Sequence, residues 1–485
     1  MSLLNKASLI QIPSGYKDGT LYSAKPTNGD GDFTFSRGSN LAATRVNSDG
    51  LIEKGRENLL LQSNQFDTTW VTGGLTETSG QSGYDSSSNA WLVENVAGGS
   101  RYMTQTGFGL GVSTFSIYAK AGTTDWIYLN NGAGVSAYYD LTNGVLGTTS
   151  GDIDSKIENI GSGWYRCSIT ASSVNEVRYY LASGNNSLST SIGDNVYFQD
   201  SQLELGLVAT DYIETGASTV QAGILEDMPR LDYSGGATCG HLLLEPQRSN
   251  LYTHSEYFDT YTKANLTIST NATTSPEGLQ NASKLVSSSG VSIKRIQPSI
   301  TTSSATDYII SAFVKKAEWQ YFFIYGDGTL SSGQNAIWDL ENGTITQGSG
   351  HTTIESFGEG WYKITWKATA SGAGSAAPRI GITDNSTGVN STGDGTSGVF
   401  LYGLQIEEGN YSTSLIPTYG ASVTRGADFS DNNDIVSNPI SFGANDDFTL
   451  FYEGSFDDLS SGFNMIMGGG NQSTGNDYKN YWWLF

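Results

Sequence analysis

Hydrophobic and polar residues alternate along most of this chain with a period of two, the pattern of half-buried β-strands. The clearest stretch is residues 319–325, where one face carries four aromatic side chains in a row. Asn143-Gly144 and Asn342-Gly343 each follow an apolar or aromatic run. Such pairs predict hairpins, because both central residues of a type I′ turn need a positive φ. With no long amphipathic helical pattern to compete, the chain is predicted to be all-β, built as antiparallel sandwiches.

The strand pattern occurs twice. Short motifs recur in the same order, with an offset that grows from 192 (250 minus 58) to 203 (409 minus 206) residues. The matched pairs include Arg56-Glu-Asn-Leu59 with Arg248-Ser-Asn-Leu251, Trp126-Ile-Tyr128 with Trp319-Gln-Tyr321, Gly163-Trp-Tyr-Arg166 with Gly360-Trp-Tyr-Lys363, and Gln202-Leu-Glu-Leu-Gly206 with Gln405-Ile-Glu-Glu-Gly409. A slowly drifting offset indicates short loop insertions in a tandem duplication.

The repeat divides the chain into five parts. They are an N-terminal attachment segment and linker (1–50), a first sandwich module (51–216), a linker (217–245), a second module (246–420), and a linker with an incomplete third sandwich (421–485). The last part has a good strand, Asp447 to Glu453, but only about 40 residues from there on, too few for a sandwich of its own. Either the sequence is a fragment or this part packs on a partner.

Charge and apolar content exclude several functions. The net charge is −23, and because an acidic surface repels the phosphate backbone, we expect no nucleic-acid binding. No stretch of about 18 apolar residues and no signal-peptide pattern occur, so we expect no membrane insertion and no export by a visible signal. The two cysteines, Cys167 and Cys239, form no CxxC pair and are expected to be buried free thiols.

Acidic residues and histidines give no pattern of an active site. The repeated acids are Asp140 with Asp339, before the hairpin turns, and Glu204 with Glu407, in the closing strand, and we expect structural roles for all four. The three histidines lack metal-ligand spacing, and no enzyme activity or cofactor is expected. Asp152 and Asp154 leave a structural Ca²⁺ open as an alternative, although no dense loop of oxygen ligands surrounds them.

Aromatic residues are the better candidates for function, because flat rings stack on the apolar faces of pyranose sugars. Seven residues are the glycan-binding candidates: Trp126, Tyr128, Tyr139, Trp319, Tyr321, Tyr325 and Trp338. The alternative is that these side chains fill the core between the two sheets. For Trp164 and Trp361, in the repeated Gly-Trp-Tyr motif, the core is the expected place.

The repeated segments resemble those of bacteriophage structural proteins. Ala42-Ala-Thr-Arg-Val46, Gly50-Leu-Ile-Glu53 and Arg56-Glu-Asn-Leu59 look like a linker found in many of them. The segment from Gln405 to Arg425 is similar to the closing strand of their carbohydrate-binding-like jelly rolls, and Asp447 to Glu453 to the first strand of a concanavalin-like (laminin-G-type) domain. Ile213-Glu-Thr215 departs from the usual Ile-Pro-Thr. The resemblance implies jelly-roll modules in a virion appendage and prescribes no catalytic residues.

Three functions are compatible with the predicted tandem sandwich modules and with the resemblance to phage structural proteins. The first is a virion appendage protein of a phage, in a tail or head fibre, whose modules attach to host-surface polysaccharide. The second is a purely architectural virion protein, such as a capsid decoration or collar component. The third is a non-catalytic binding region of a secreted polysaccharide-degrading enzyme. For the first, we expect the protein to be made in the bacterial cytoplasm and built into the virion. Its N-terminal segment would then bind other virion proteins, and the resemblance implies a homo-oligomer, with a trimer as the guess.

Overall fold

The computed structural model describes residues 7, 9–17, 19–38, 41–331, 335–431, 468–469 and 482–483. Within these ranges the chain is all-β, as predicted: β-strands form every regular element apart from two short 3-10 turns, η1 (Ser234–Gly236) and η2 (Gly328–Leu330). None of the described helical segments is long and apolar enough to cross a membrane. The predicted third sandwich lies outside the described residues, except for the short pair β40 (Gly468–Gly469) and β41 (Trp482–Trp483).

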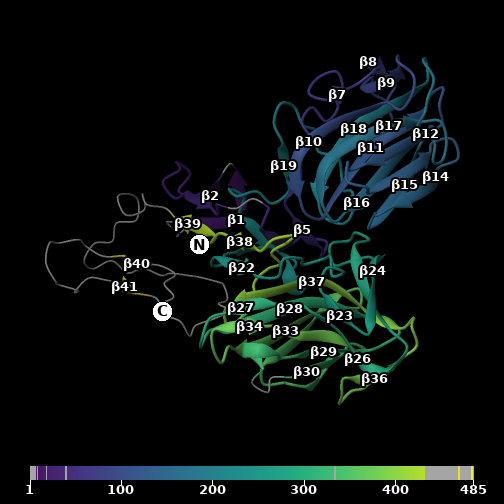
Figure 1. Cartoon of the computed structure of the whole chain (residues 1–485). Coiled ribbons are helices and arrows are strands. Elements are labelled where there is room, and N and C mark those ends of the chain that lie inside the picture. Colours follow the sequence, from purple (N-terminus) through teal and green to yellow (C-terminus); the bar gives the residue numbers. More distant parts are fainter. Residues whose placement is uncertain are drawn as a thin grey trace.

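The first module is a sandwich of two six-stranded antiparallel sheets (Figure 1). One sheet has the order β14 (Val145–Ser150), β13 (Ser136–Asp140), β12 (Trp126–Asn130), β17 (Val174–Ala182), β10 (Tyr102–Leu110), β7 (Val71–Thr72). The other has the order β15 (Asp154–Gly161), β16 (Trp164–Ala171), β11 (Ser113–Ala121), β18 (Asn195–Leu205), β9 (Ala90–Asn95), β8 (Leu75–Gln81). Alternate apolar residues of both sheets meet in one core.

The second module repeats this arrangement. Its first sheet runs β23 (Thr262–Ala264), β26 (Gly290–Gln297), β35 (Arg379–Thr383), β29 (Tyr321–Tyr325), β30 (Ala336–Asp339), β31 (Thr344–Gln347), with β36 (Asn390–Gly393) paired to β26. Its second sheet runs β24 (Leu266–Thr273), β25 (Ala282–Ser287), β37 (Gly398–Glu408), β28 (Asp307–Lys316), β33 (Trp361–Thr369), β32 (Thr352–Gly358). A strand pair, β27 (Ile300–Thr302) with β34 (Gly374–Ala376), completes the module, and a second core lies between its sheets.

Short strands close each module where the chain enters and leaves it. β6 (Arg56–Asn58) pairs with β19 (Val220–Ala222) at the first module, and β22 (Arg248–Asn250) pairs with β38 (Val423–Arg425) at the second. Asn58 and Asn250 reinforce the closure, since each side-chain amide donates to two backbone carbonyls from later in its module. The repeated Arg-x-Asn-Leu motif therefore closes the base of each module, which is the end where the chain enters and leaves it. We call these two closures, β6 with β19 and β22 with β38, the clasps.

The linker before each module forms a hairpin. β4 (Thr44–Val46) pairs with β5 (Ile52–Lys54) before the first module, and β20 (Arg230–Asp232) pairs with β21 (His241–Leu243) before the second. The first hairpin packs on the second module, where Ile52 is buried beside Phe313 and Trp361. The Lys54 Nζ atom lies 2.6 Å from a carboxylate oxygen of Glu256 and 2.8 Å from one of Glu277.

The N-terminal segment forms a sheet with residues that follow the second module. β1 (Ile10–Lys17), β2 (Thr20–Lys25) and β3 (Phe33–Ser36) lie side by side, and β3 pairs with β39 (Phe429–Asp431) (Figure 1). The N-terminal segment and the residues that follow the second module thus meet through backbone pairing of β3 with β39. The predicted binding of this segment to other virion proteins stays a prediction.

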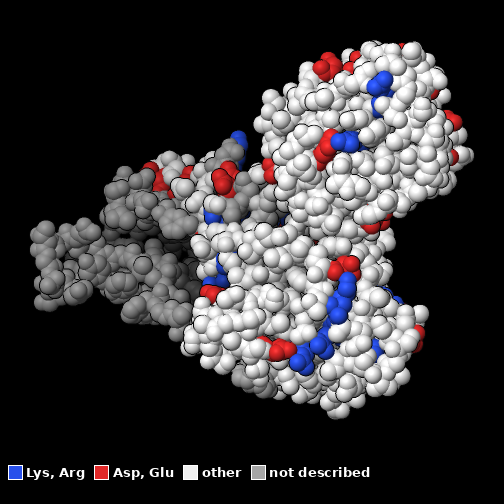
Figure 2. All heavy atoms as spheres, viewed as in Figure 1, with Lys and Arg blue, Asp and Glu red and all other residues white. Residues whose placement is uncertain are grey.

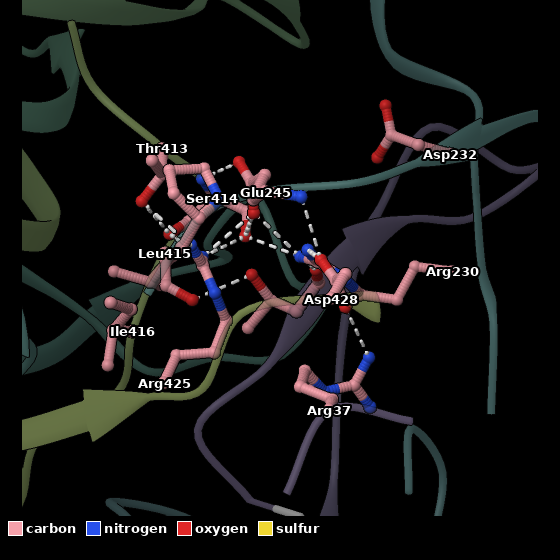
Figure 3. Close-up of polar contacts among 12 residues, drawn as sticks. Arg37, Arg230, Asp232, Glu245, Thr413, Ser414, Leu415, Ile416, Arg425 and Asp428 are labelled. Atoms are coloured by element: carbon pink, nitrogen blue, oxygen red, sulfur yellow. Dashed lines mark hydrogen bonds and ion pairs between the residues drawn. The ribbon is translucent and has the colours of Figure 1, made fainter. Parts of the chain in front are cut away.

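A buried group of charges, the junction cluster, lies where β3 ends and β39 begins. It consists of Arg37, Arg230, Glu245, Arg425 and Asp428 (Figure 3). Both Arg230 and Arg425 place a guanidinium nitrogen 2.8 Å from Glu245, and Asp428 accepts from Arg37 and Arg230. Burial raises the pKa of Glu245, but the charges of Arg425 and Arg230 outweigh it and lower that pKa to about 2. The N-terminal segment, the linker before the second module and the linker after it are held together here.

Three local expectations from the sequence are wrong. Cys167 is buried in the first core, but Cys239 is exposed, because it lies in the loop of the β20–β21 hairpin. Trp164 and Trp361 are buried, but on the outer faces of the second sheets, where Tyr118 covers one and Ile52 the other. The strand pleat places the following Tyr165 and Tyr362 against the cores instead.

The third correction concerns the turns. Both Asn-Gly pairs do lie in hairpins, but only Gly144 and Gly343 have a positive φ. These are longer turns, in which Asp140 and Asp339 accept backbone hydrogen bonds from the loop. Both central residues have a positive φ in a different pair of turns, Ser162-Gly163 and Glu359-Gly360, as a type I′ turn requires.

Candidate functional site

Five aromatic residues gather on the outer surface of the first module, on the sheet that contains β12. This surface, the aromatic face, consists of Tyr102, Trp126, Tyr128, Tyr138 and Tyr180. Because Ile127, Leu129 and Tyr139 point into the core, strand alternation turns Trp126, Tyr128 and Tyr138 outward. The strand register then sets Tyr138, Tyr128, Tyr180 and Tyr102 in one row across β13, β12, β17 and β10.

The rings of this row touch one another. Ring centroids are 4.4 Å apart for Tyr128 and Tyr138, 5.4 Å for Tyr128 and Tyr180, and 4.6 Å for Tyr102 and Tyr180. Burial raises the pKa of Tyr138, and the phenols of Tyr128 and Tyr180 raise it further, so the Tyr138 hydroxyl stays protonated at neutral pH. Trp126 borders the row beside Gly147, where an added Cβ would lie 2.7 Å from the indole ring.

Polar side chains flank the rings. The guanidinium of Arg178 lies 5.1 Å from the centroid of the Tyr102 ring, a cation–π contact. Glu176 binds Arg178 through two hydrogen bonds of 2.6 and 2.8 Å, and it also accepts from the Thr104 hydroxyl. Asn130 donates to the hydroxyl of Tyr128. The row is partly exposed at Tyr102, Tyr128 and Tyr180, while Tyr138 is only 9% exposed. Partly exposed rings with fixed donors and acceptors beside them have the features that sugar recognition needs.

The seven candidates from the sequence separate into four groups. Trp126 and Tyr128 belong to the aromatic face. Tyr321 and Tyr325 lie half-buried on the corresponding face of the second module, and Trp319 precedes β29 and packs partly against the second core. Tyr139 and Trp338 are 0% exposed in the cores, where they donate to the carbonyls of Ser168 and Thr353. A ligand cannot stack on these last two, which removes them as candidates.

Sequence reasoning left out three members of the aromatic face. Tyr138 is the chain neighbour of the candidate Tyr139, whereas Tyr102 and Tyr180 have no candidate beside them in the sequence. Both come from strands far from Trp126 in sequence, and only the pairing of β10, β17 and β12 brings them together. The adjacent pair Tyr179 and Tyr180 could have indicated this surface, because neighbouring residues of a strand point to opposite sides. The ring of Tyr179 lies in the core and that of Tyr180 lies outside it.

The remaining acidic residues have local structural partners. Glu204 and Glu407 are buried, and each accepts hydrogen bonds from the backbone and the hydroxyl of one threonine, Thr210 or Thr413. Asp152 accepts from Ser155, and Asp154 accepts from Asn271 of the second module. In the part of the chain that the structure describes, no group of three or more His, Cys, Asp or Glu residues is placed to hold a metal ion.

Comparison with known proteins identifies no family. No family model matches the chain, and no curated protein matches it. Among solved structures, the chain is similar to the N-terminal CBM22-1-CBM22-2 tandem domain of Xyn10C from Paenibacillus barcinonensis. That match covers 77% of this chain and 100% of the other, with 11% sequence identity and a TM-score of 0.22. At that score the two molecules share no overall superposition, so function must be argued from the chain's own residues.

Proposed function

We propose that this protein is a phage virion appendage, part of a tail or head fibre, whose sandwich modules bind polysaccharide on the host surface. The observation that carries the binding part of the proposal is the aromatic face. Its row of touching rings is a surface on which the apolar faces of pyranoses can stack. Arg178, Glu176 and Asn130 lie beside the rings and can form hydrogen bonds with the hydroxyls of the sugar. The virion part rests on the repeated linker motifs, such as Ala42 to Val46, and their resemblance to phage structural proteins.

The test of binding is a glycan array probed with the whole chain, followed by titration of the best ligand. Replacing Tyr180, which contacts two other rings, by alanine should weaken binding about tenfold, equivalent to about 1.4 kcal/mol. Tyr197→Ala is the matched control, because Tyr197 lies on the outer surface of the opposite sheet of the same module. The proposal fails if no bacterial surface polysaccharide binds, or if Tyr197→Ala weakens binding as much as Tyr180→Ala.

A purely architectural virion role is the second candidate, and the junction cluster is the observation that favours it. This cluster and the β3–β39 pairing tie the N-terminal segment to the base of the second module. Such ties suit a protein that must transmit force or fill a fixed place in a particle. Saturable binding of a glycan that depends on Tyr180 would exclude a role limited to architecture.

A further inference from the structure

The two modules present the same surface with different residues. Asp140 and Asp339 begin equivalent turns, and they pair with Trp126 and Tyr321 respectively. Tyr321 is therefore the structural counterpart of Trp126, two residues beyond the Trp126–Trp319 match expected from the sequence. Backbone hydrogen bonds agree, since Leu141 donates to Asp125 and Leu340 donates to Gln320.

This register shows what replaces the tyrosine row in the second module. The row Tyr128, Tyr180, Tyr102 across β12, β17 and β10 becomes Phe323, Gly381, Arg295 across β29, β35 and β26. The ring of Phe323 fills the place of a side chain at 381, because an added Cβ there would lie 2.6 Å from it. Phe323 is buried, so the rings left for a ligand on this face are those of Tyr321 and Tyr325.

The same face gains a positive charge. Arg379 takes the place of Arg178, and its Nε atom lies 3.0 Å from Asp327, as Arg178 pairs with Glu176 in the first module. Arg295 is additional. Its Nε atom donates to Gln297, and none of the ion pairs among the described residues supplies it with a carboxylate. Burial lowers the pKa of Arg295 and the nearby charge of Arg379 lowers it further, while the carboxylate of Asp327 offsets part of this, which agrees with two neighbouring guanidinium groups near one carboxylate.

Both carboxylate oxygens of Asp327 already accept hydrogen bonds. One of its oxygens accepts from the backbone of Gly328, and the other accepts from Arg379 and Gln297. The face therefore carries two guanidinium groups for one committed carboxylate, on a chain whose net charge is −23. Figure 2 shows a stripe of Lys and Arg over the region of β23, β26 and β29, while most of the visible surface is uncharged.

We propose that this surface of the second module, the arginine face (Arg295, Tyr321, Tyr325 and Arg379), binds a saccharide that carries a carboxylate. Guanidinium groups hold carboxylates through paired, charge-assisted hydrogen bonds, and the two half-exposed tyrosines would stack on the sugar ring. The inference rests on the proposed function and deepens it. The first module, whose arginine is neutralised by Glu176, takes uncharged sugars, and the second takes acidic ones.

The experiment titrates the whole chain with short uronic-acid oligosaccharides, oligogalacturonate and oligomannuronate, each beside its carboxyl-reduced form. We expect the acidic form to bind at least about tenfold more tightly than the reduced form, with the difference shrinking as salt is raised. Arg295→Gln should remove most of that difference, and Arg295→Lys should restore only part of it, since an ammonium lacks the paired donors. Lys363→Gln is the matched control, because it removes one charge from the opposite sheet of the same module.

The outcomes separate this inference from the proposed function. Loss of acidic binding in Arg295→Gln, with no loss in Lys363→Gln or in Tyr180→Ala, supports the arginine face. Glycan binding that depends on Tyr180 but ignores both carboxyl reduction and Arg295→Gln overturns the inference and leaves the proposed function standing. Failure of both acidic oligosaccharides to bind overturns the inference alone, and failure of every glycan on the array as well overturns the proposed function too. Circular dichroism of each variant establishes that it is folded.

Discussion

Tyr138 and Tyr139 are adjacent on β13 and have opposite surroundings. Tyr138 faces the outer side of the sheet and is 9% exposed, whereas Tyr139 faces the core, is 0% exposed and donates a 2.6 Å hydrogen bond to the carbonyl of Ser168. A period of two predicts that neighbours point to opposite sides, but it does not say which side is the core. That choice depends on the opposite sheet, so the sequence could indicate an aromatic stripe without separating stacking residues from core residues.

Removing the hydroxyl of Tyr139 tests this assignment. Tyr139→Phe keeps the ring in the core but leaves the Ser168 carbonyl without this donor, so the free energy of unfolding should fall by about 1 kcal/mol. Glycan affinity should not change. Urea unfolding and the binding titration check the two expectations separately, and a loss of affinity equal to that of Tyr180→Ala would show that Tyr139 contacts the ligand.

At the scale of elements, the repeated motifs predicted that strands and hairpins occur, but they did not predict the strand register or the turn geometry. Trp126 and Trp319 look alike in sequence, but pairing with β13 and β30 fixes a register that differs by two residues. The Asn-Gly hairpins exist with another turn geometry, because the side chain of the preceding aspartate organises a longer loop. Local sequence similarity carries no information on cross-strand register, which depends on contacts between distant strands.

The turn assignment can be tested with two substitutions. Gly163 has a φ of 78°, and an added Cβ would make only ordinary van der Waals contact with Lys120, 3.7 Å away, so Gly163→Ala should cost about 1 kcal/mol through backbone strain. Asn143 has no positive φ, and Asn143→Ala should cost less, because it loses only the side-chain bond to Asp140. Unfolding midpoints in urea give the comparison. An Asn143→Ala cost above that of Gly163→Ala would indicate a primed turn at Asn143-Gly144.

At the scale of the whole molecule, the linkers do more than connect modules. The repeated motifs could be recognised in the sequence, but the packing of the β4–β5 hairpin on the second module could not. It depends on Lys54 meeting Glu256 and Glu277, more than 200 residues further along the chain. The junction cluster is similar: its charges come from four separate segments, and no spacing rule connects them.

The junction cluster predicts a dependence of stability on pH. Glu245 has a folded pKa of about 2, below its ordinary value of 4.5, so its contribution is complete above about pH 4.5 and is lost as the pH falls toward 2. A difference of this size corresponds to about 3 kcal/mol. Thermal unfolding followed between pH 6 and pH 2 should show the loss in the native chain.

Glu245→Gln is the corresponding variant. It should destabilise the chain at pH 7 by about 3–5 kcal/mol, because Arg230 and Arg425 would remain buried with a carboxylate removed. It should also flatten the dependence on pH in that window. Glu53→Gln serves as control, since its ion pair with Arg45 is partly exposed, and it should change little. An unchanged pH profile in Glu245→Gln would contradict the assignment.

The clasps at the base of each module bear on how such a chain can evolve. Because β6 lies beside β19, and β22 beside β38, the chain leaves each sandwich next to the point where it entered. A module with adjacent ends behaves as a cassette: it can be duplicated, exchanged between genomes by recombination, or removed without pulling the flanking segments apart. After duplication, one copy can change the residues of a surface while the sandwich stays the same. The tyrosine row of the first module and the arginine face of the second differ in this way, which would give the chain a second binding specificity.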